Sequence, residues 1–194
     1  MKTDTSKIKE IFKDLTFSDF EISILESVFH KVTYKKGAVI LKANDIVTMQ
    51  YYIYDGCLRS YHIDAQGKEH TVQFGIKDWW ISDYTAFFTT SKSIMNIEVL
   101  KDATLLRLSH KDKDYLYAQI PKIESFFRKK LERAFAAFQK RILSGLSQTA
   151  TQRYINFINK YPNIERSVKN YHIASYLGIT TESLSRIRKE LSRH

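Results

Sequence analysis

Residues 169–191, KNYHIASYLGITTESLSRIRKEL, decide how the last part of the chain folds. Apolar residues recur at helical spacing on both sides of Gly178, so the stretch predicts two helices joined by a tight turn. Gly178 suits the left-handed conformation that such a turn needs. The Thr180 hydroxyl can accept a free backbone N–H where the second helix begins. The predicted inner face consists of Ile173, Leu177, Ile179, Leu184, Ile187 and Leu191.

The outward face of the second predicted helix carries polar side chains that a core does not need. A Glu accepts from cytosine, an Arg forms a bidentate pair with guanine, and a Ser can serve either role. We therefore expect the base-reading residues to be Thr181, Glu182, Ser185 and Arg186. Phosphate contacts fix the register on a duplex without reading its sequence. The expected phosphate-binding residues are Lys169, Thr180, Arg188 and Lys189.

The net charge of +10 is concentrated at the same end of the chain. Residues 1–121 hold 16 basic and 16 acidic residues, whereas residues 122–194 hold 15 basic and 5 acidic residues. A neutral first part and a basic second part favour two roles, with a polyanion as partner of the second. The alternative is a solvated basic surface without a partner.

The first 121 residues indicate two short helices followed by strands. A capping box at Ser18 and Glu21 predicts the start of the second helix. Between Lys31 and Ser109, short runs of β-branched and aromatic residues alternate with turns such as Asp55-Gly56 and Gln66-Gly67. This pattern predicts an all-β barrel or sandwich.

A long helix is predicted to follow, with Pro121 in its first turn. The helical pattern has no Gly or Pro until Gly145, which corresponds to a length of ~35 Å. One small β domain could not cover its apolar stripe, so we predict that the helix dimerises on a second copy. The alternative is burial against its own domain. The predicted dimer residues are Phe127, Leu131, Phe135, Phe138 and Ile142.

This order of elements resembles the Crp/Fnr family of bacterial transcription regulators over nearly the whole chain. Residues 56–61, GCLRSY, followed by 67–69, GKE, resemble the family's β-roll hairpin, and residues 177–186 resemble its recognition segment. The resemblance implies an α+β fold. Its parts are an N-terminal double-stranded β-helix (a jelly-roll-like cyclic-nucleotide-binding-domain fold), a long dimerisation helix and a C-terminal helix-turn-helix domain. Because the sequence stops at His194, we expect this domain to lack most of the family's wing.

The recognition segment is similar to that of the fumarate–nitrate branch of the family. That branch reads its operator with a Glu-x-x-Ser-Arg set, which Glu182, Ser185 and Arg186 match. In the catabolite-activator branch an Arg precedes this Glu, whereas here the residue is Thr181. The iron–sulfur cysteines of the fumarate–nitrate branch are absent, because Cys57 is the one cysteine of the chain. Oxygen sensing through such a cluster is therefore excluded.

The expected sensor pocket departs from the cyclic-AMP-binding pattern of the family. Those members carry a Gly-Glu and, about ten residues later, an Arg-Ser pair that holds the phosphate; here the second pair becomes Ser93-Ile94. Asp83 could reach a sugar hydroxyl, but Lys92 lacks the planar fork of arginine. The expected pocket residues are Trp80, Asp83, Lys92 and Ser93. The aromatic residues of this region either line a different, apolar pocket or belong to the core: Trp79, Trp80, Tyr84, Phe87 and Phe88.

We therefore predict a β-roll sensor domain over residues 1–121, a dimerisation helix over 122–146 and a helix-turn-helix domain over 147–194. The predicted function is that of a cytoplasmic, homodimeric regulator that binds specific DNA sequences and does not bind cyclic AMP in the usual way. The expected partners are double-stranded DNA, a second copy, RNA polymerase and a small-molecule effector of unknown identity, and no membrane, metal or cofactor is expected.

Three alternatives stay open. The helix-turn-helix could contact a protein instead of DNA, or the aromatic side chains could fill the pocket and leave no ligand. A cupin-like enzyme would need a metal triad, which the histidine spacing does not provide. The sequence also has no phosphate loop, nucleophile elbow or paired carboxylates, so we predict that the protein is not an enzyme.

Overall fold

An antiparallel sheet of six strands forms the first half of the computed structural model, which describes residues 5–192. Its central path runs β1-β6-β3-β4, while β2 pairs with β6 and β5 pairs with β3. The strands are β1 (His30–Tyr34), β2 (Val39–Leu41), β3 (Met49–Ile63), β4 (Glu69–Ile76), β5 (Trp80–Ile81) and β6 (Asn96–Ser109).

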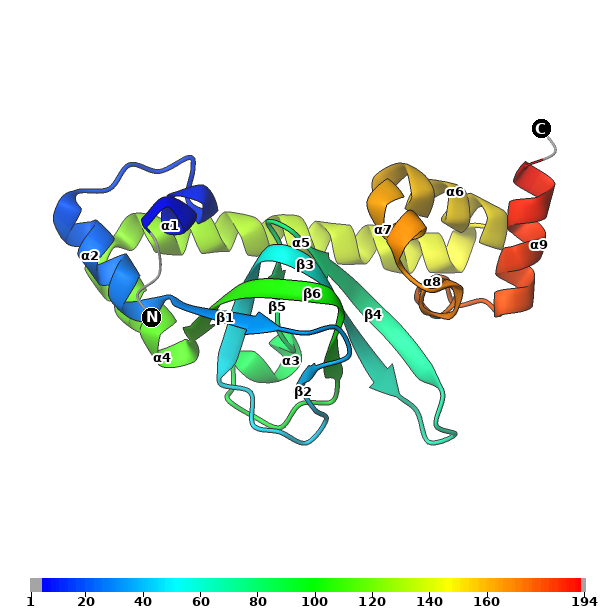
Figure 1. Ribbon diagram of the computed structural model, residues 1–194, viewed down its shortest axis with the longest axis horizontal. Coiled ribbons are helices and arrows are strands. Elements are labelled where there is room, and N and C mark those ends of the chain that lie inside the picture. The colour runs from blue at the N-terminus through cyan, green and yellow to red at the C-terminus, as the bar shows by residue number, and fades with distance from the viewer. Residues whose placement is uncertain (1–4, 193–194) are drawn as a thin grey trace.

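In the sequence, helices come before, within and after the strands of the sheet. Those before and within the sheet region are α1 (Thr5–Ile11), α2 (Asp19–Val28) and α3 (Tyr84–Phe87). Those that follow the sheet are α4 (His110–Gln119), α5 (Pro121–Ser147), α6 (Ala150–Lys160), α7 (Pro162–Ser167), α8 (Asn170–Leu177) and α9 (Thr181–Leu191). Figure 1 shows α5 running the length of the molecule, with α1, α2 and α4 at one end and α6–α9 at the other. The predicted α+β class is confirmed.

The structure confirms two features that we predicted at the starts of helices. Pro121 is in the first turn of α5, where its missing N–H costs no helical hydrogen bond. Ser18 and Glu21 form the predicted capping box of α2: the Ser18 N–H donates to the Glu21 carboxylate at 2.7 Å, and the Glu21 N–H donates to the Ser18 hydroxyl at 3.3 Å.

The predicted turn at Asp55-Gly56 is wrong, because β3 continues through it. The pairing of β3 with β6 shifts in register on both sides of Gly56, so the strand bulges here instead of turning back. Gly56 has φ +111°, and a Cβ at this position would lie 2.6 Å from the Ala103 Cβ on β6. Glycine thus permits both the conformation and the close approach of the two strands.

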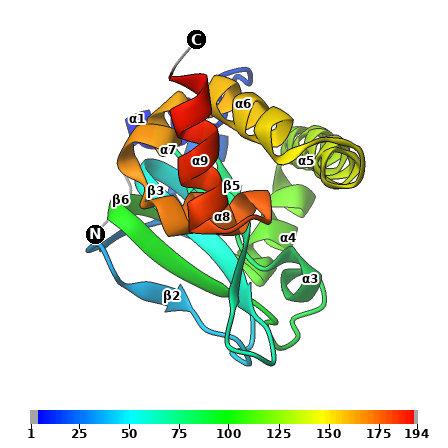
Figure 2. The same cartoon turned by 90° about the vertical axis from the view of Figure 1, so that its right-hand side faces the viewer.

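Three large clusters of buried side chains hold the molecule together. One lies inside the sheet and includes Ile53, Leu58 and Leu105. A second joins α1 and α2 to the first turns of α5, around the fully buried ring of Phe12. The third joins the sheet to the last helices, because Phe74 of β4 packs with Phe157 of α6. The final helices therefore share a core with the sheet, and Figure 2 shows α8 in front of its strands.

Candidate nucleic-acid interface and sensor contacts

The hairpin of α8 and α9 forms as its sequence predicts. Gly178 has φ 68° and ends α8, where its N–H donates to the carbonyls of Ala174 and Ser175. The Thr180 hydroxyl accepts from the Ser183 N–H at 3.2 Å and so caps α9. Leu184 and Ile187 are buried and hold the inner face of α9 against the domain.

The opposite face of α9 is exposed and polar. Glu182, Ser185 and Arg186 lie at helical positions i, i+3 and i+4, so the structure brings them together on one face. The Thr181 hydroxyl donates to the Glu182 carboxylate at 3.1 Å. The pKa of Glu182 is held below its usual value, first by its own backbone N–H and then by the hydroxyls of Thr180 and Thr181. Glu182 is therefore ionised at neutral pH and can only accept hydrogen bonds.

Arg186 and Arg188 differ sharply although both lie on α9. The Arg186 side chain is exposed and makes no hydrogen bond or ion pair within residues 5–192. The Arg188 guanidinium donates to the Tyr154 hydroxyl at 2.9 Å, to Asn170 Oδ1 at 2.5 Å and to Glu165 Oε1 at 2.8 Å. These contacts tie α9 to α6, α7 and α8. The Arg188 side chain is thus engaged within the domain, whereas we expected from the sequence that it contacts a DNA phosphate.

The other three expected phosphate-binding residues lie at different points of the hairpin. Lys169 precedes α8, Thr180 precedes α9, and Lys189 lies on α9. Lys169 is exposed immediately before α8, with its ammonium 5.7 Å from the centre of the Tyr171 ring. Lys189 is exposed in the last turn of α9. Thr180 is exposed, but its hydroxyl already caps α9. Two lysines are therefore available to an anion.

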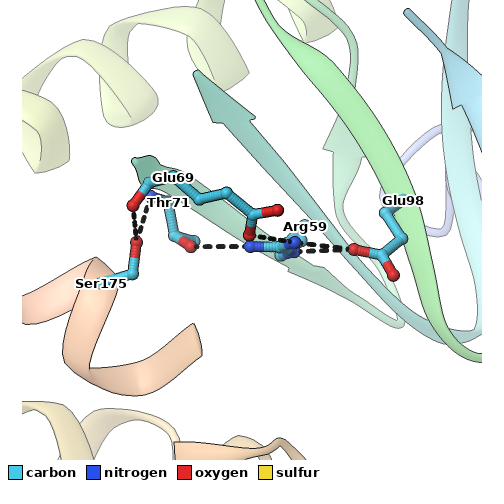
Figure 3. A network of polar contacts seen from close by, with 5 residues as sticks. All are labelled: Arg59, Glu69, Thr71, Glu98 and Ser175. Atoms are coloured by element: carbon cyan, nitrogen blue, oxygen red, sulfur yellow. Dashed lines mark hydrogen bonds and ion pairs between the residues drawn. The ribbon is translucent and has the colours of Figure 1, made fainter. Parts of the chain in front are cut away.

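A buried arginine connects the sheet to α8, as Figure 3 shows. Arg59 of β3 is 2% exposed and pairs with Glu69 at 2.6 Å and with Glu98 at 2.8 Å. Its guanidinium also lies 3.5 Å from the Thr71 hydroxyl. Ser175 of α8 extends this network, because its hydroxyl donates to the Glu69 carbonyl at 2.7 Å and accepts from the Thr71 N–H at 2.8 Å.

A second arginine reinforces the same junction from α5. The Arg141 guanidinium donates to the carbonyls of Thr71 and Val72 on β4 and to the carbonyl of Tyr176 on α8. It also stacks over the Tyr176 ring, 4.0 Å from the ring centre. A single side chain therefore joins the long helix, the sheet and the first helix of the hairpin. This junction could not be predicted from the sequence, since no local pattern relates residues 71, 141 and 176.

The four expected pocket residues do not form one site. Asp83 is fully buried and accepts from the Ser93 hydroxyl at 2.8 Å, from the Ile94 N–H at 2.9 Å and from Thr85. Burial alone would raise the pKa of Asp83, but these hydrogen bonds outweigh it and lower that pKa. Lys92 forms a backbone bridge with Ile46. Asp83 and Ser93 thus hold their own loop closed, while Trp80 lies apart, with its ring centre 4.9 Å from that of Phe127.

Four of the five expected dimer residues lie on an unpartnered part of α5. Ten consecutive residues, 131–140, are exposed, and Phe135 and Ile142 are 65% and 62% exposed. Leu131 and Phe138 are each about 40% exposed. Phe127 is 5% exposed and packs on Phe12 and Trp80 within its own chain. Phe127 therefore belongs to the core, where Phe12, which follows α1, Trp80 of β5 and Tyr117 of α4 pack around its ring.

The chain is similar to known regulators along most of its length. Residues 31–119 match the family described as cyclic nucleotide-binding domain. The chain is 24% identical to the "Anaerobic regulatory protein" of Aggregatibacter actinomycetemcomitans, over 93% of this chain and 74% of that protein. It is 22% identical to the "Fumarate and nitrate reduction regulatory protein" of Vibrio cholerae, over 93% of this chain and 76% of that protein.

A solved structure shows the same fold. It is that of a putative transcriptional regulator of the Crp/Fnr family from Eubacterium rectale, with a TM-score of 0.71, 16% identity, and coverage of 94% of this chain and 86% of that one. No helix within residues 5–192 has the length and apolar character needed to cross a membrane. The similar proteins are regulators, which confirms the prediction that the protein is not an enzyme. Over most of its length the chain is thus similar to transcription regulators of the Crp/Fnr type, and it shares the fold of a solved regulator of that family.

Proposed function

We propose that the protein is a homodimeric transcription regulator that binds specific DNA sequences by placing α9 in the major groove. The observation that carries this proposal is the exposed face of Glu182, Ser185 and Arg186 on a helix whose other face is buried. A Glu and an unpaired Arg offer an acceptor and a bidentate donor to base edges. Thr181 lies at the edge of this face. The similarity to regulatory proteins supports the same role.

The positive charge of the second part of the chain supports binding to a polyanion. Lys169 and Lys189 flank the proposed base-reading face and can meet phosphates. The N-terminus of α9 offers a further contact to a phosphate. Arg188 acts differently in this proposal: it fixes the orientation of α9 through Tyr154, Asn170 and Glu165.

The exposed apolar stretch of α5 supports a two-fold dimer. Soluble monomers rarely leave a large contiguous apolar patch in water, and a second α5 can cover this one. Two α9 helices related by a two-fold axis would enter half-sites about 34 Å apart on a pseudo-palindromic sequence. The family resemblance adds RNA polymerase as the partner that the bound dimer would recruit or exclude.

Selection from a random duplex pool tests DNA recognition by the full chain. We expect enrichment of a two-fold site, with log affinity falling steeply against log salt concentration because phosphates release counterions. Salt-dependent binding without enrichment would contradict base reading by α9. An absence of binding at every salt concentration would favour a hairpin that contacts a protein.

Sedimentation of one variant and its control tests the dimer. Ile142→Glu places a charge in the exposed apolar stretch of α5, and we expect it to shift the protein from dimer to monomer while its helical content is retained. Lys129→Glu changes charge on the exposed surface of the same helix outside this stretch and is expected to remain a dimer. Equal sedimentation of the two variants would contradict the proposed interface.

We also propose that the sensor does not hold a cyclic nucleotide in the way usual for the family. Asp83 is saturated by hydrogen bonds within its loop, and residues 77–95 contain no arginine for a phosphate. Cyclic AMP and cyclic GMP are therefore expected to leave the melting temperature unchanged, since only a ligand that binds the folded state raises it. A rise that depends on nucleotide concentration would overturn this part of the proposal.

A further inference from the structure

Two histidines face each other across the hairpin of β3 and β4. His62 of β3 and His70 of β4 are directly paired in the antiparallel register, so their side chains point to the same face of the sheet. The Cβ atoms of such a cross-strand pair lie roughly 4.5–5.5 Å apart. Both residues are exposed, and Figure 1 shows the loop of this hairpin projecting away from α5. The pair is therefore open to solvent and lies outside the stretch of α5 that we assign to the second copy.

Each of the two imidazole rings has one nitrogen fixed by an oxygen acceptor. His62 Nδ1 lies 2.9 Å from the Ile94 carbonyl oxygen, which can only accept, so the neutral ring carries its proton on Nδ1. His70 Nε2 lies 2.6 Å from the Asp64 carboxylate, so this neutral ring carries its proton on Nε2. The lone pairs of His62 Nε2 and His70 Nδ1 remain, and neither atom has a hydrogen-bond partner within residues 5–192.

This arrangement is typical of histidines that bind a metal. A metal-ligating histidine almost always donates its other ring N–H to a carboxylate or a backbone carbonyl, which fixes the tautomer and the orientation of the ring. The hairpin supplies one acceptor of each kind. Asp64 is itself held in place, because its Oδ1 accepts from the N–H groups of Gln66 and Lys68, each at 3.0 Å. The two rings are therefore oriented before any ion binds.

The chemistry of the donors selects the class of ion. Imidazole nitrogens suit Zn²⁺, Ni²⁺ and Cu²⁺, whereas Mg²⁺ and Ca²⁺ prefer oxygen ligands. Among the described residues, no group of three or more histidine, cysteine or carboxylate side chains could hold a metal ion. The hairpin thus offers two protein ligands, and water completes the coordination of the ion. This open coordination differs from that of the closed four-ligand sites that stabilise a fold.

We propose that His62 and His70 together bind one divalent late-transition-metal ion, represented by Zn²⁺. The bound ion would join β3 to β4 beside Glu69 and Thr71, whose backbone groups bond to the Ser175 hydroxyl of α8. It would therefore fasten the strand to which the α8–α9 hairpin is attached. Control of DNA binding by this ion rests on the proposed function, but binding of the ion does not and can be measured without DNA.

Titration calorimetry of the full chain, without an added histidine tag, tests the site. We expect the wild type to bind one Zn²⁺ per chain at this hairpin, and Mg²⁺ not to bind there. His62→Gln and His70→Gln are each expected to weaken Zn²⁺ binding at least about tenfold, the loss that removal of even an outer-shell partner causes. His30→Gln is the control, because His30 is an exposed histidine of β1 outside the hairpin. Wild-type affinity in both hairpin variants, or an equal loss in His30→Gln, would overturn the proposal.

A double variant distinguishes one shared ion from separate binding to each ring. If both rings hold the same ion, the variant that lacks His62 and His70 loses no more affinity than either single variant. Additive losses would contradict a shared ion. Zn²⁺ is also expected to slow hydrogen exchange at the amides of Ile63 and Glu69, which pair beside the histidines, in the wild type but not in His70→Gln. Circular dichroism checks the folding of each variant. Because no DNA is present, failure here and failure of the DNA selection are separate results.

Discussion

The helices α8 and α9 form one hairpin, yet their polar residues have opposite surroundings. On α8, the Ser175 hydroxyl and the Tyr176 carbonyl are bonded to the sheet and to Arg141. On α9, Ser185 and Arg186 are exposed and have no such contacts within residues 5–192. One helix of the hairpin is therefore fixed to the sheet, while the other leaves its polar face free. A shift of β4 would act on α9 through α8.

The largest effect is expected from Arg59, the buried arginine of β3. Arg59→Met leaves Glu69 and Glu98 without their cation, so we expect the free energy of unfolding to fall by about 3 kcal/mol in urea titrations. Lys35→Met is the control, since Lys35 pairs with Asp102 at the surface and is expected to cause no measurable loss. Equal stabilities of the two variants would show that the Arg59 network does not hold the junction.

The next effect separates the two arginines of α9. Arg186→Ala is expected to weaken binding to the selected site by about 1–3 kcal/mol and to relax specificity at one base pair, without lowering the melting temperature. Arg188→Ala is expected to lower the melting temperature, because it removes three hydrogen bonds between helices. Binding titrations and thermal melts of both variants measure this. A lower melting temperature of Arg186→Ala would contradict the conclusion that the Arg186 side chain is free on the outward face of α9.

A smaller effect is expected from the hydroxyl of α8. Ser175→Ala removes the hydrogen bond to the Glu69 carbonyl and leaves the Thr71 N–H unpaired, which costs about 1 kcal/mol. Hydrogen exchange at the Thr71 amide should become faster. Ser167→Ala, whose hydroxyl contacts only Asn163 in its own helix, is the control. Unchanged exchange at Thr71 would mean that Ser175 does not protect this strand.

The smallest effect near neutral pH comes from a histidine at the same junction. Burial, followed by the charges of Arg59 and Lys169, lowers the pKa of His172 from 6.5 to about 4. The unfolded chain therefore binds this proton first as the pH falls. The stability that neutral His172 provides is complete above pH 6.5 and is lost between about pH 6.5 and pH 4.

Unfolding titrations across this pH range compare the wild type with His172→Leu, which has no titrating group at this position. We expect the stability of the wild type relative to the variant to decrease as the pH falls through this window. A constant difference between the two proteins would show that His172 is not held neutral by the fold.

The local features of the molecule could be predicted from the sequence, because short-range patterns dictate them. Gly178 and Thr180 fix a turn and a cap through contacts three to four residues away. The apolar spacing along residues 121–147 predicts one long helix, and the outward face of α9 follows from the same periodicity. The bulge at Gly56 could not be predicted, because a Gly after Asp is typical of a turn. Only the close approach of Ala103 on β6 distinguishes a bulge from a turn at this position.

The connections between the parts depend on tertiary structure. Ser175 meets Glu69 across 106 residues, and Arg59 meets Glu98 only because the register of β3 and β6 aligns them. Phe127 is buried by Phe12 and Trp80, although it lies on the same apolar stripe as the exposed Phe135. Periodicity specifies which face of an element is apolar, but not which neighbour covers that face. Contacts distant in the sequence make that choice, and in this protein they join the sheet to the hairpin that we propose reads DNA.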